Sequence, residues 1–187
     1  MLRDFSRLNI YLNRLISDIY PQPPDEGHTT MAYDVFDKWI VALTGVRSVL
    51  DAGCGDTAFM KSKFEGIGMK YTGIAIGVNN PEIYNMDFTF TEFENNQFDL
   101  VFARHALEHS PMPIITLMEW HRIAKHFLCL VNPNPAYYGT IGRNHYSVVD
   151  RNQLVEWARL ANWFPIWEDD TNNTEIRIMF EKVGEKK

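Results

Sequence analysis

The chain has 187 residues, of which 45% are hydrophobic and 22% are charged. This composition is typical of a soluble globular protein, and the length predicts about one domain with a buried core. The formal net charge of −6 excludes a basic surface over the whole fold, so we expect no binding to duplex nucleic acid. No hydrophobic run reaches the roughly 18 residues of a membrane-spanning helix. The two cysteines indicate no disulfide framework, so a cytoplasmic protein is expected.

Residues 1–45 are predicted to form an N-terminal helical cover. Hydrophobic residues recur every three or four positions in 4–20, as on one face of an amphipathic helix, and Asp4 is its expected N-cap. A second helix with the same spacing is expected at 31–43, after a proline-rich loop. We expect the first helix to lie on the core; contact with a second copy in a homodimer, or cover over a substrate, is the alternative.

From residue 46 onward, strand and helix patterns alternate, which predicts an α/β fold with a parallel sheet. Residues 80–97 are expected to form a polar loop in which Phe88, Phe90 and Phe93 add a short strand or turn. The last two strands are predicted to form a hairpin. One compact domain is therefore expected, with the cover at 1–45 and the α/β part at 46–187. The expected strands are 48–51, 71–76, 98–103, 127–131, 163–168 and 174–182, and the expected helices are 58–65, 114–126 and 150–161, the last capped by Asp150.

The first strand ends in Asp51, Gly53, Cys54 and Gly55, the most informative stretch of the sequence. Two glycines one residue apart let the backbone turn sharply and approach a ligand closely. In open α/β sheets, ligands bind outside the carboxyl ends of the strands, where this turn lies. These residues resemble motif I of the class I S-adenosylmethionine-dependent methyltransferases, in particular the small-molecule and quinone-type enzymes of that class.

The resemblance implies a Rossmann-like, doubly wound sheet of seven strands with the last strand antiparallel. It also implies S-adenosylmethionine as cofactor and S-adenosylhomocysteine as product. Asp51 would accept hydrogen bonds from the turn or from the cofactor's ammonium group, and residues 53–55 would pack against the cofactor. Asp87 and Phe88 stand where the family binds the adenine amino group and packs against the ring; a turn cap is the alternative for Asp87.

The sequence departs from the family pattern at two positions. Thr57 replaces the third glycine, and Ala75, followed by Ile76, stands where similar proteins have an acidic residue that binds both ribose hydroxyls. Losing such a charge-assisted contact costs about 1.5–3 kcal/mol of binding free energy. Three explanations stay open: a polar residue of the following loop (Asn79, Asn80 or Glu82) substitutes, the cofactor binds weakly, or the site has lost its function.

Residues 98–109 resemble the fourth strand of the family and the loop beyond it, which implies that Arg104 and His105 face the cofactor. His109 and His145 are candidate acid–base or acceptor-orienting residues, because an imidazole with a pKa near 6.5 can take a proton from an attacking group. A loop histidine that only holds the backbone is the alternative.

Two other motifs match formally. His105, Glu108 and His109 fit the H-x-x-E-H zinc pattern, but that pattern needs a helix, and the two prolines within 110–113 break one, so no metal site is predicted. Gly53, Gly55 and Ala58 fit the dinucleotide fingerprint, but Ala75 removes the acid that this fold also uses. The predicted function is methyl transfer to a small molecule or to a protein side chain; the alternative is a degenerate methyltransferase-like binding module.

Overall fold

The computed structural model of the protein describes residue 10 and residues 30–138, 145–169 and 174–184. The predicted helix at 4–20, and with it the predicted homodimer contact, lies outside these ranges apart from Ile10. None of the described helices is long and hydrophobic enough to cross a membrane.

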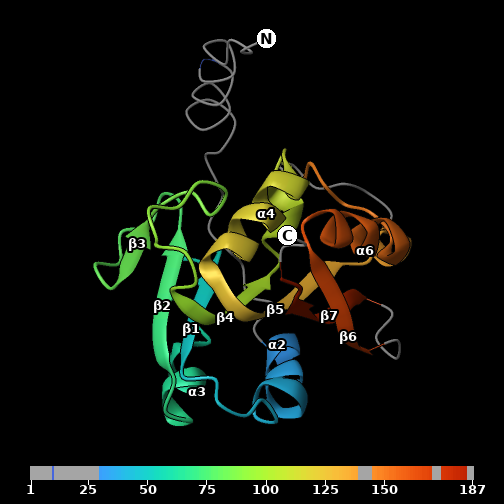
Figure 1. Ribbon diagram of the computed structural model, residues 1–187. Coiled ribbons are helices and arrows are strands. Elements are labelled where there is room, and N and C mark those ends of the chain that lie inside the picture. The colour runs from blue at the N-terminus through green and yellow to red at the C-terminus, as the bar shows by residue number, and fades with distance from the viewer. Residues whose placement is uncertain (1–9, 11–29, 139–144, 170–173, 185–187) are drawn as a thin grey trace.

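The described residues form one seven-stranded sheet, in the order β3-β2-β1-β4-β5-β7-β6 (Figure 1). Strands β3, β2, β1, β4 and β5 run parallel to one another. β7 lies antiparallel between β5 and β6. The predicted doubly wound sheet with an antiparallel last strand and a terminal hairpin is therefore confirmed. The strands are β1 Ser48–Ala52, β2 Lys70–Ala75, β3 Ile83–Asn85, β4 Phe98–Arg104, β5 Ala124–Pro133, β6 Trp163–Asp169 and β7 Glu175–Lys182.

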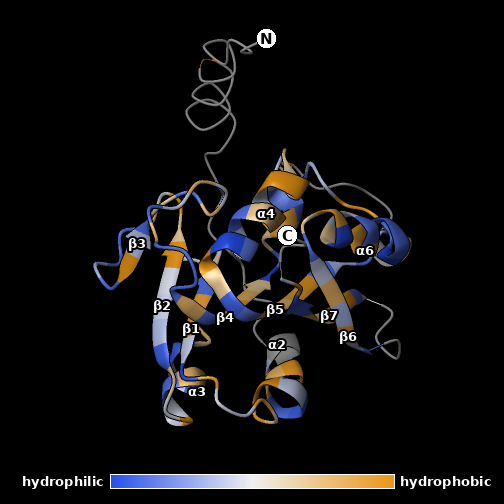
Figure 2. Ribbon diagram, viewed as in Figure 1, coloured by the Kyte–Doolittle hydropathy of each residue, from blue (hydrophilic) through white to orange (hydrophobic). Residues whose placement is uncertain are grey.

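Helices cover both faces of the sheet. α4 (Pro113–Ile123) and α6 (Arg151–Leu160) pack on one face through a cluster that includes Leu117, Trp120 and Leu154. α2 (Thr30–Val35), the π-helix η2 (Phe36–Ile40) and α3 (Lys61–Gly66) pack on the other through Phe36 and Phe64. α6 is largely hydrophilic on its outward side (Figure 2). Because both faces are covered, the central strands are hydrophobic in almost every position.

Three helices differ from the prediction, and two of these differences have a local reason. The helix expected from 58 begins at Lys61, because Ala58 adopts a left-handed φ of 45° that a right-handed helix cannot contain. The helix expected to reach 126 ends at Ile123, because Ala124 is extended and pairs with Phe98 in the sheet. The expected helix 31–43 is described as α2 followed by η2, with a change from α to π geometry after Val35. The predicted cap is confirmed, since the Asp150 carboxylate accepts from the N–H of Gln153 at 2.9 Å.

The connections on either side of β3 contain no helix. Residues 76–82 lead from β2 to β3, and residues 86–97 lead from β3 to β4, all of them in turns or irregular structure. The short strand expected near Phe88 lies slightly earlier, at β3. Phe88 itself is buried and its ring lies 5.9 Å from that of Trp120. Parallel strands usually cross over through a helix, so these two connections leave the ends of β2 and β3 covered by loop only.

Candidate functional site

The glycine turn after β1 lies tightly against its neighbours. Gly53 has a φ of 80°, and a Cβ at this position would lie 2.7 Å from the Cβ of Ala106. The N–H groups of Gly53 and Cys54 both donate to the carbonyl of Ile74 in β2, at 2.9 and 3.1 Å. A left-handed φ favours glycine, and a contact this close requires it. The turn is therefore fixed over the ends of β1 and β2 by its sequence.

Asp51 and Arg104 lie at the carboxyl ends of the adjacent strands β1 and β4. Asp51 is buried and accepts a hydrogen bond of 2.8 Å from the Tyr71 hydroxyl. Burial raises the pKa of Asp51 to about 7, while the Tyr71 hydrogen bond and the charge of Arg104 oppose this rise. The Nε and Nη2 atoms of Arg104 are buried and have no hydrogen-bond partner. These two atoms form one edge of the guanidinium group, which is the edge that binds a carboxylate with two parallel hydrogen bonds.

Other residues of the predicted cofactor site contact neighbouring parts of the protein. The Cys54 side chain packs against β2, since a Cβ on Gly73 would meet its Sγ at 2.8 Å, and burial raises the pKa of the thiol. Phe88 belongs to the core, and a Cβ added at Gly53 would lie 4.0 Å from the Cε1 atom of its ring. Asp87 caps the turn that follows it, accepting from the N–H of Thr89 at 2.7 Å. Burial also raises the pKa of Asp87.

The loop after β2 uses most of its polar groups internally. Asp56 accepts from the backbone N–H groups of Asn79 and Asn80, at 2.9 and 3.0 Å. The Asn80 side chain donates to the Asp56 carbonyl and accepts from the N–H of Glu82, whose own carboxylate pairs with Lys61 at 2.8 Å. Of the three loop residues considered as substitutes for the missing acid, Asn80 and Glu82 are thus engaged elsewhere. Asn79 is exposed.

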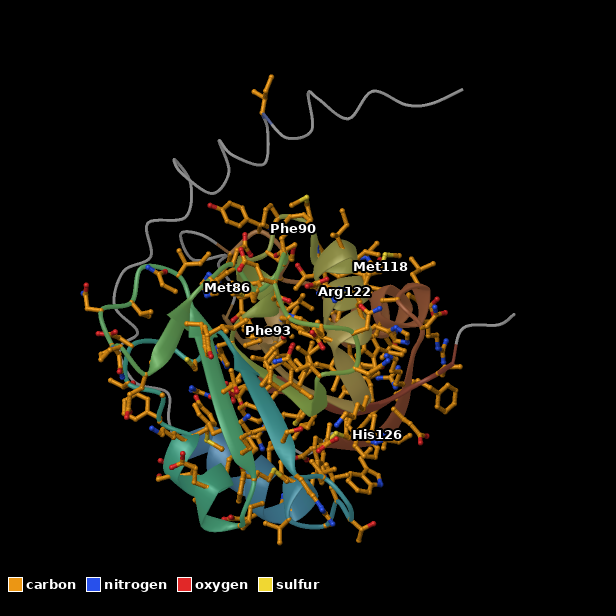
Figure 3. All side chains as sticks on the ribbon, turned by 60° about the vertical axis from the view of Figure 1, so that its left-hand side comes forward. Met86, Phe90, Phe93, Met118, Arg122 and His126 are labelled. Atoms are coloured by element: carbon orange, nitrogen blue, oxygen red, sulfur yellow. The ribbon has the colours of Figure 1, made fainter. Side chains whose placement is uncertain are left out.

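Ala75, half-buried Ile76 and Met86 mark the open end of this region. Ala75 ends β2, and its carbonyl accepts from the N–H of Met86 at 3.1 Å. Met86 is partly exposed beyond β3 (Figure 3). β2 contributes no acidic side chain at this end, in agreement with the departure from the family pattern at Ala75.

Placing an acid at position 75 measures how much cofactor-binding free energy is lost because Ala75 stands there. We expect Ala75→Asp to tighten S-adenosylmethionine binding by about tenfold or more, since a bidentate charge-assisted contact contributes about 1.5–3 kcal/mol. Isothermal titration calorimetry measures the change, with Ala75→Asn as the isosteric neutral control. Equal affinity of the aspartate and asparagine variants would show that no ribose hydroxyl reaches this position.

His105 is held by carboxylates rather than pointing freely into the site. Its Nε2 lies 2.8 Å from Glu175 on β7, and its Nδ1 lies 3.5 Å from the Glu108 carboxylate. Glu175 in turn pairs with Arg177 at 2.9 Å, and Arg177 pairs with Asp34 of α2 at 2.7 Å. Burial alone would raise the pKa of Glu175, but the contacts with His105 and Arg177 hold it below its ordinary value. The chain of ionic contacts thus links α2 through β7 to the loop after β4.

The two predicted catalytic histidines lie together. The rings of His109 and His145 are 4.8 Å apart, edge to face, although 36 positions separate them in the sequence. Glu108, which is fully buried, lies beside them. Burial and the charge of His105 lower the pKa of His145, which favours the neutral imidazole. Away from this pair of histidines, Arg122 and Glu119 of α4 form an ion pair at 2.7 Å.

The sequence analysis missed Tyr71, Glu175 and Arg177. Glu175 and Arg177 alternate with isoleucines in a strand that is otherwise hydrophobic. Charged residues in such a strand are rarely buried unless they are paired, so this alternation is the signal that could have marked them. Their partners lie 70 and 143 positions away, and only the fold reveals them.

The sheet order and the glycine turn after β1 define the class: the protein has the fold of the class I S-adenosylmethionine-dependent methyltransferases. The family model described as a methyltransferase domain matches residues 11–179, and the chain belongs to that family. The predicted class is thereby confirmed, and with it S-adenosylmethionine as the methyl donor that this class uses. A search of curated proteins finds no significant match to the chain.

Solved structures agree with this assignment. The 1,6-didemethyltoxoflavin-N1-methyltransferase of Burkholderia thailandensis, with its substrate and S-adenosylhomocysteine bound, is 14% identical, with a TM-score of 0.66 over 98% of this chain and 92% of its own. The magnesium protoporphyrin IX methyltransferase of Synechocystis PCC 6803, with S-adenosylmethionine bound, is 14% identical, with a TM-score of 0.63 over 98% and 100%. The cyclase SpnF is 14% identical, with a TM-score of 0.70 over 95% of both chains. At these identities the likeness concerns the fold.

Proposed function

We propose that the protein transfers a methyl group from S-adenosylmethionine to a small-molecule acceptor. The observation that carries the proposal is the buried Nε and Nη2 edge of Arg104, which has no partner, beside the buried carboxyl of Asp51. An unpaired buried guanidinium edge is costly, and a ligand carboxylate would satisfy it.

The residues present fit the amino-acid end of the cofactor. That end carries an ammonium group and a carboxylate on neighbouring atoms, and Asp51 and Arg104 offer one complementary charge to each. The left-handed turn at Gly53 and Gly55 lets the backbone approach without a side chain between. At the other end, Ile76, Asp87 and Met86 would border the adenine, with the Asp87 carboxyl accepting from its amino group.

The bound cofactor supplies a methyl group on a positively charged sulfur. The contribution of this chain is to hold donor and acceptor in line and to exclude water from the reacting atoms. His105, fixed between Glu175 and Glu108, would shape the wall of the site next to the methyl donor.

His109 and His145 are proposed to act on the acceptor side. A neutral imidazole there can orient an acceptor hydroxyl or amine and take its proton. A small molecule is favoured as acceptor because two neighbours of this fold are named for small substrates, a toxoflavin precursor and a protoporphyrin.

Calorimetric titration of the full chain with S-adenosylmethionine tests the proposal, with S-adenosylhomocysteine as the second ligand and NAD as the control. Binding of the first two in the micromolar range, without binding of NAD, is the expected result. Transfer of radiolabelled methyl groups to a panel of hydroxyl and amine acceptors would then identify the substrate class. A folded sample, verified by circular dichroism, that binds neither adenosyl ligand would overturn the proposal.

A further inference from the structure

Glu108, His109 and His145 form a cluster whose potential ligand atoms all lie within 4.8 Å of one another. We call these three residues the His–Glu cluster. Glu108 and His109 belong to the short 3-10 helix η3 (Leu107–His109), and His145 lies in the segment before α6. Two imidazoles and one carboxylate form a common ligand set for zinc and similar divalent metals.

The cluster is assembled by the backbone. The N–H groups of Tyr146 and Ser147 both donate to the carbonyl of Glu108, at 2.7 and 3.0 Å. The Ser147 hydroxyl donates to the carbonyl of Ser110, just beyond η3. Three hydrogen bonds thus fasten the residues next to His145 onto η3. The ligand atoms are therefore brought together before any ion binds, and a shift of about 1 Å in the side chains would bring them to the spacing of a metal site, with metal–ligand bonds of roughly 2.0–2.2 Å.

Glu108 is oriented by a second layer of contacts. One of its oxygens, Oε1, lies 3.5 Å from His105 Nδ1, and His105 is itself bound to Glu175 at 2.8 Å. This contact fixes the direction of the Glu108 carboxylate within the cluster. Outer contacts of this kind orient the ligands of metal sites.

We propose that the His–Glu cluster binds one divalent transition-metal ion on the acceptor side of the site. Three protein ligands leave at least one coordination position open, and that position suits an acceptor oxygen. With the metal bound, the metal rather than an imidazole would promote loss of the proton by lowering the pKa of that oxygen, because an imidazole that binds a metal has no lone pair left to take the proton. The H-x-x-E-H pattern in the sequence combines His109 with His105. In the structure, His109 lies beside His145, and His105 contacts the carboxylates of Glu108 and Glu175. The inference of a metal site is independent of the proposed function. Only the role of the metal toward the acceptor rests on that function.

The test is a titration of the full-length, chelator-treated protein with CoCl₂, followed by visible absorption, and with ZnCl₂, followed by calorimetry. We expect saturable binding of one ion per chain, with a cobalt absorption band. His109→Gln, His145→Gln and Glu108→Gln should each weaken binding by about tenfold or more, as altered metal surroundings do. His145 is half-buried and lies outside any helix or strand. The effect of His145→Gln on metal binding can therefore be measured even if the fold does not tolerate a change at buried Glu108.

The matched control is His126→Gln. His126 is exposed near the start of β5, at the opposite end of the strands from Met86 (Figure 3), and its replacement should leave binding unchanged. The inference is overturned if the folded protein binds no cobalt up to millimolar concentration, or if the cluster variants bind it as the parent does. Titrating S-adenosylmethionine into the same metal-free sample separates the outcomes: cofactor binding without cobalt binding refutes only the metal site, and the reverse refutes only the methyl-transfer proposal.

Discussion

Replacing Arg177 with methionine is expected to lower the free energy of unfolding by about 3–5 kcal/mol, because it leaves a buried carboxylate without its main partner. The Arg177 side chain is 2% exposed, and that of Glu175 is 0% exposed. Arg177 also pairs with Asp34 and with Asp169, at 2.7 and 3.3 Å, so its loss removes ionic contacts of β7 with both α2 and β6. Urea denaturation followed by circular dichroism measures the change.

Two control variants separate burial from charge in this experiment. Arg151→Met removes an arginine whose pair with Glu168 lies on the surface, 47% and 33% exposed, and should cost less than about 1 kcal/mol. Glu175→Gln combined with Arg177→Met removes both buried charges and should recover part of the lost stability. If Arg177→Met cost no more than Arg151→Met, the buried network would carry no measurable share of the stability.

Replacing Arg104 with methionine is expected to weaken S-adenosylmethionine binding by at least about 30-fold, or about 2 kcal/mol, the lower bound for truncating one partner of a buried charge pair. The same change should leave the unfolding free energy unchanged or raise it, because the Nε and Nη2 atoms have no partner in the protein. Calorimetry and urea denaturation of the same sample therefore separate a role in binding from a role in folding.

Decarboxylated S-adenosylmethionine makes the test specific for the proposed contact. The parent protein should bind it more weakly than S-adenosylmethionine, and in Arg104→Met this preference should vanish. The exposed Arg159 of α6 provides the matched control, since Arg159→Met should retain both affinities. A preference that survives in Arg104→Met would place the cofactor's carboxylate elsewhere.

The architecture was largely predictable because its signals are local. A hydrophobic run followed by two glycines marks β1 and its turn, and the alternating patterns place the other central strands within a few residues. Helix starts were less predictable. The left-handed conformation of Ala58 depends on packing against residues such as Ile83, in another part of the chain, and nothing in the adjacent sequence indicates it.

Only those parts of the site whose residues are close to one another in the sequence could be predicted. The turn at 51–55 and the pair Arg104–His105 follow directly on strands, so their place at the carboxyl edge could be inferred. The approach of His145 to His109, and of Glu175 to His105, depends on pairing between distant segments. Contacts of this kind appear only when the sheet order is known.

The position of β7 has a consequence for synthesis on the ribosome. β7 inserts between β5 and β6, although it is the last of the seven strands of this sheet to be made. Until it emerges, the edge of β5 has no partner strand, and an unpaired edge is prone to wrong association. Glu175 and Arg177 arrive with this strand, so His105 lacks its contact with Glu175, and Asp34 of α2 lacks its contact with Arg177, until then. The side of the site that His105 forms is therefore expected to reach its final geometry late, when β7 enters the sheet.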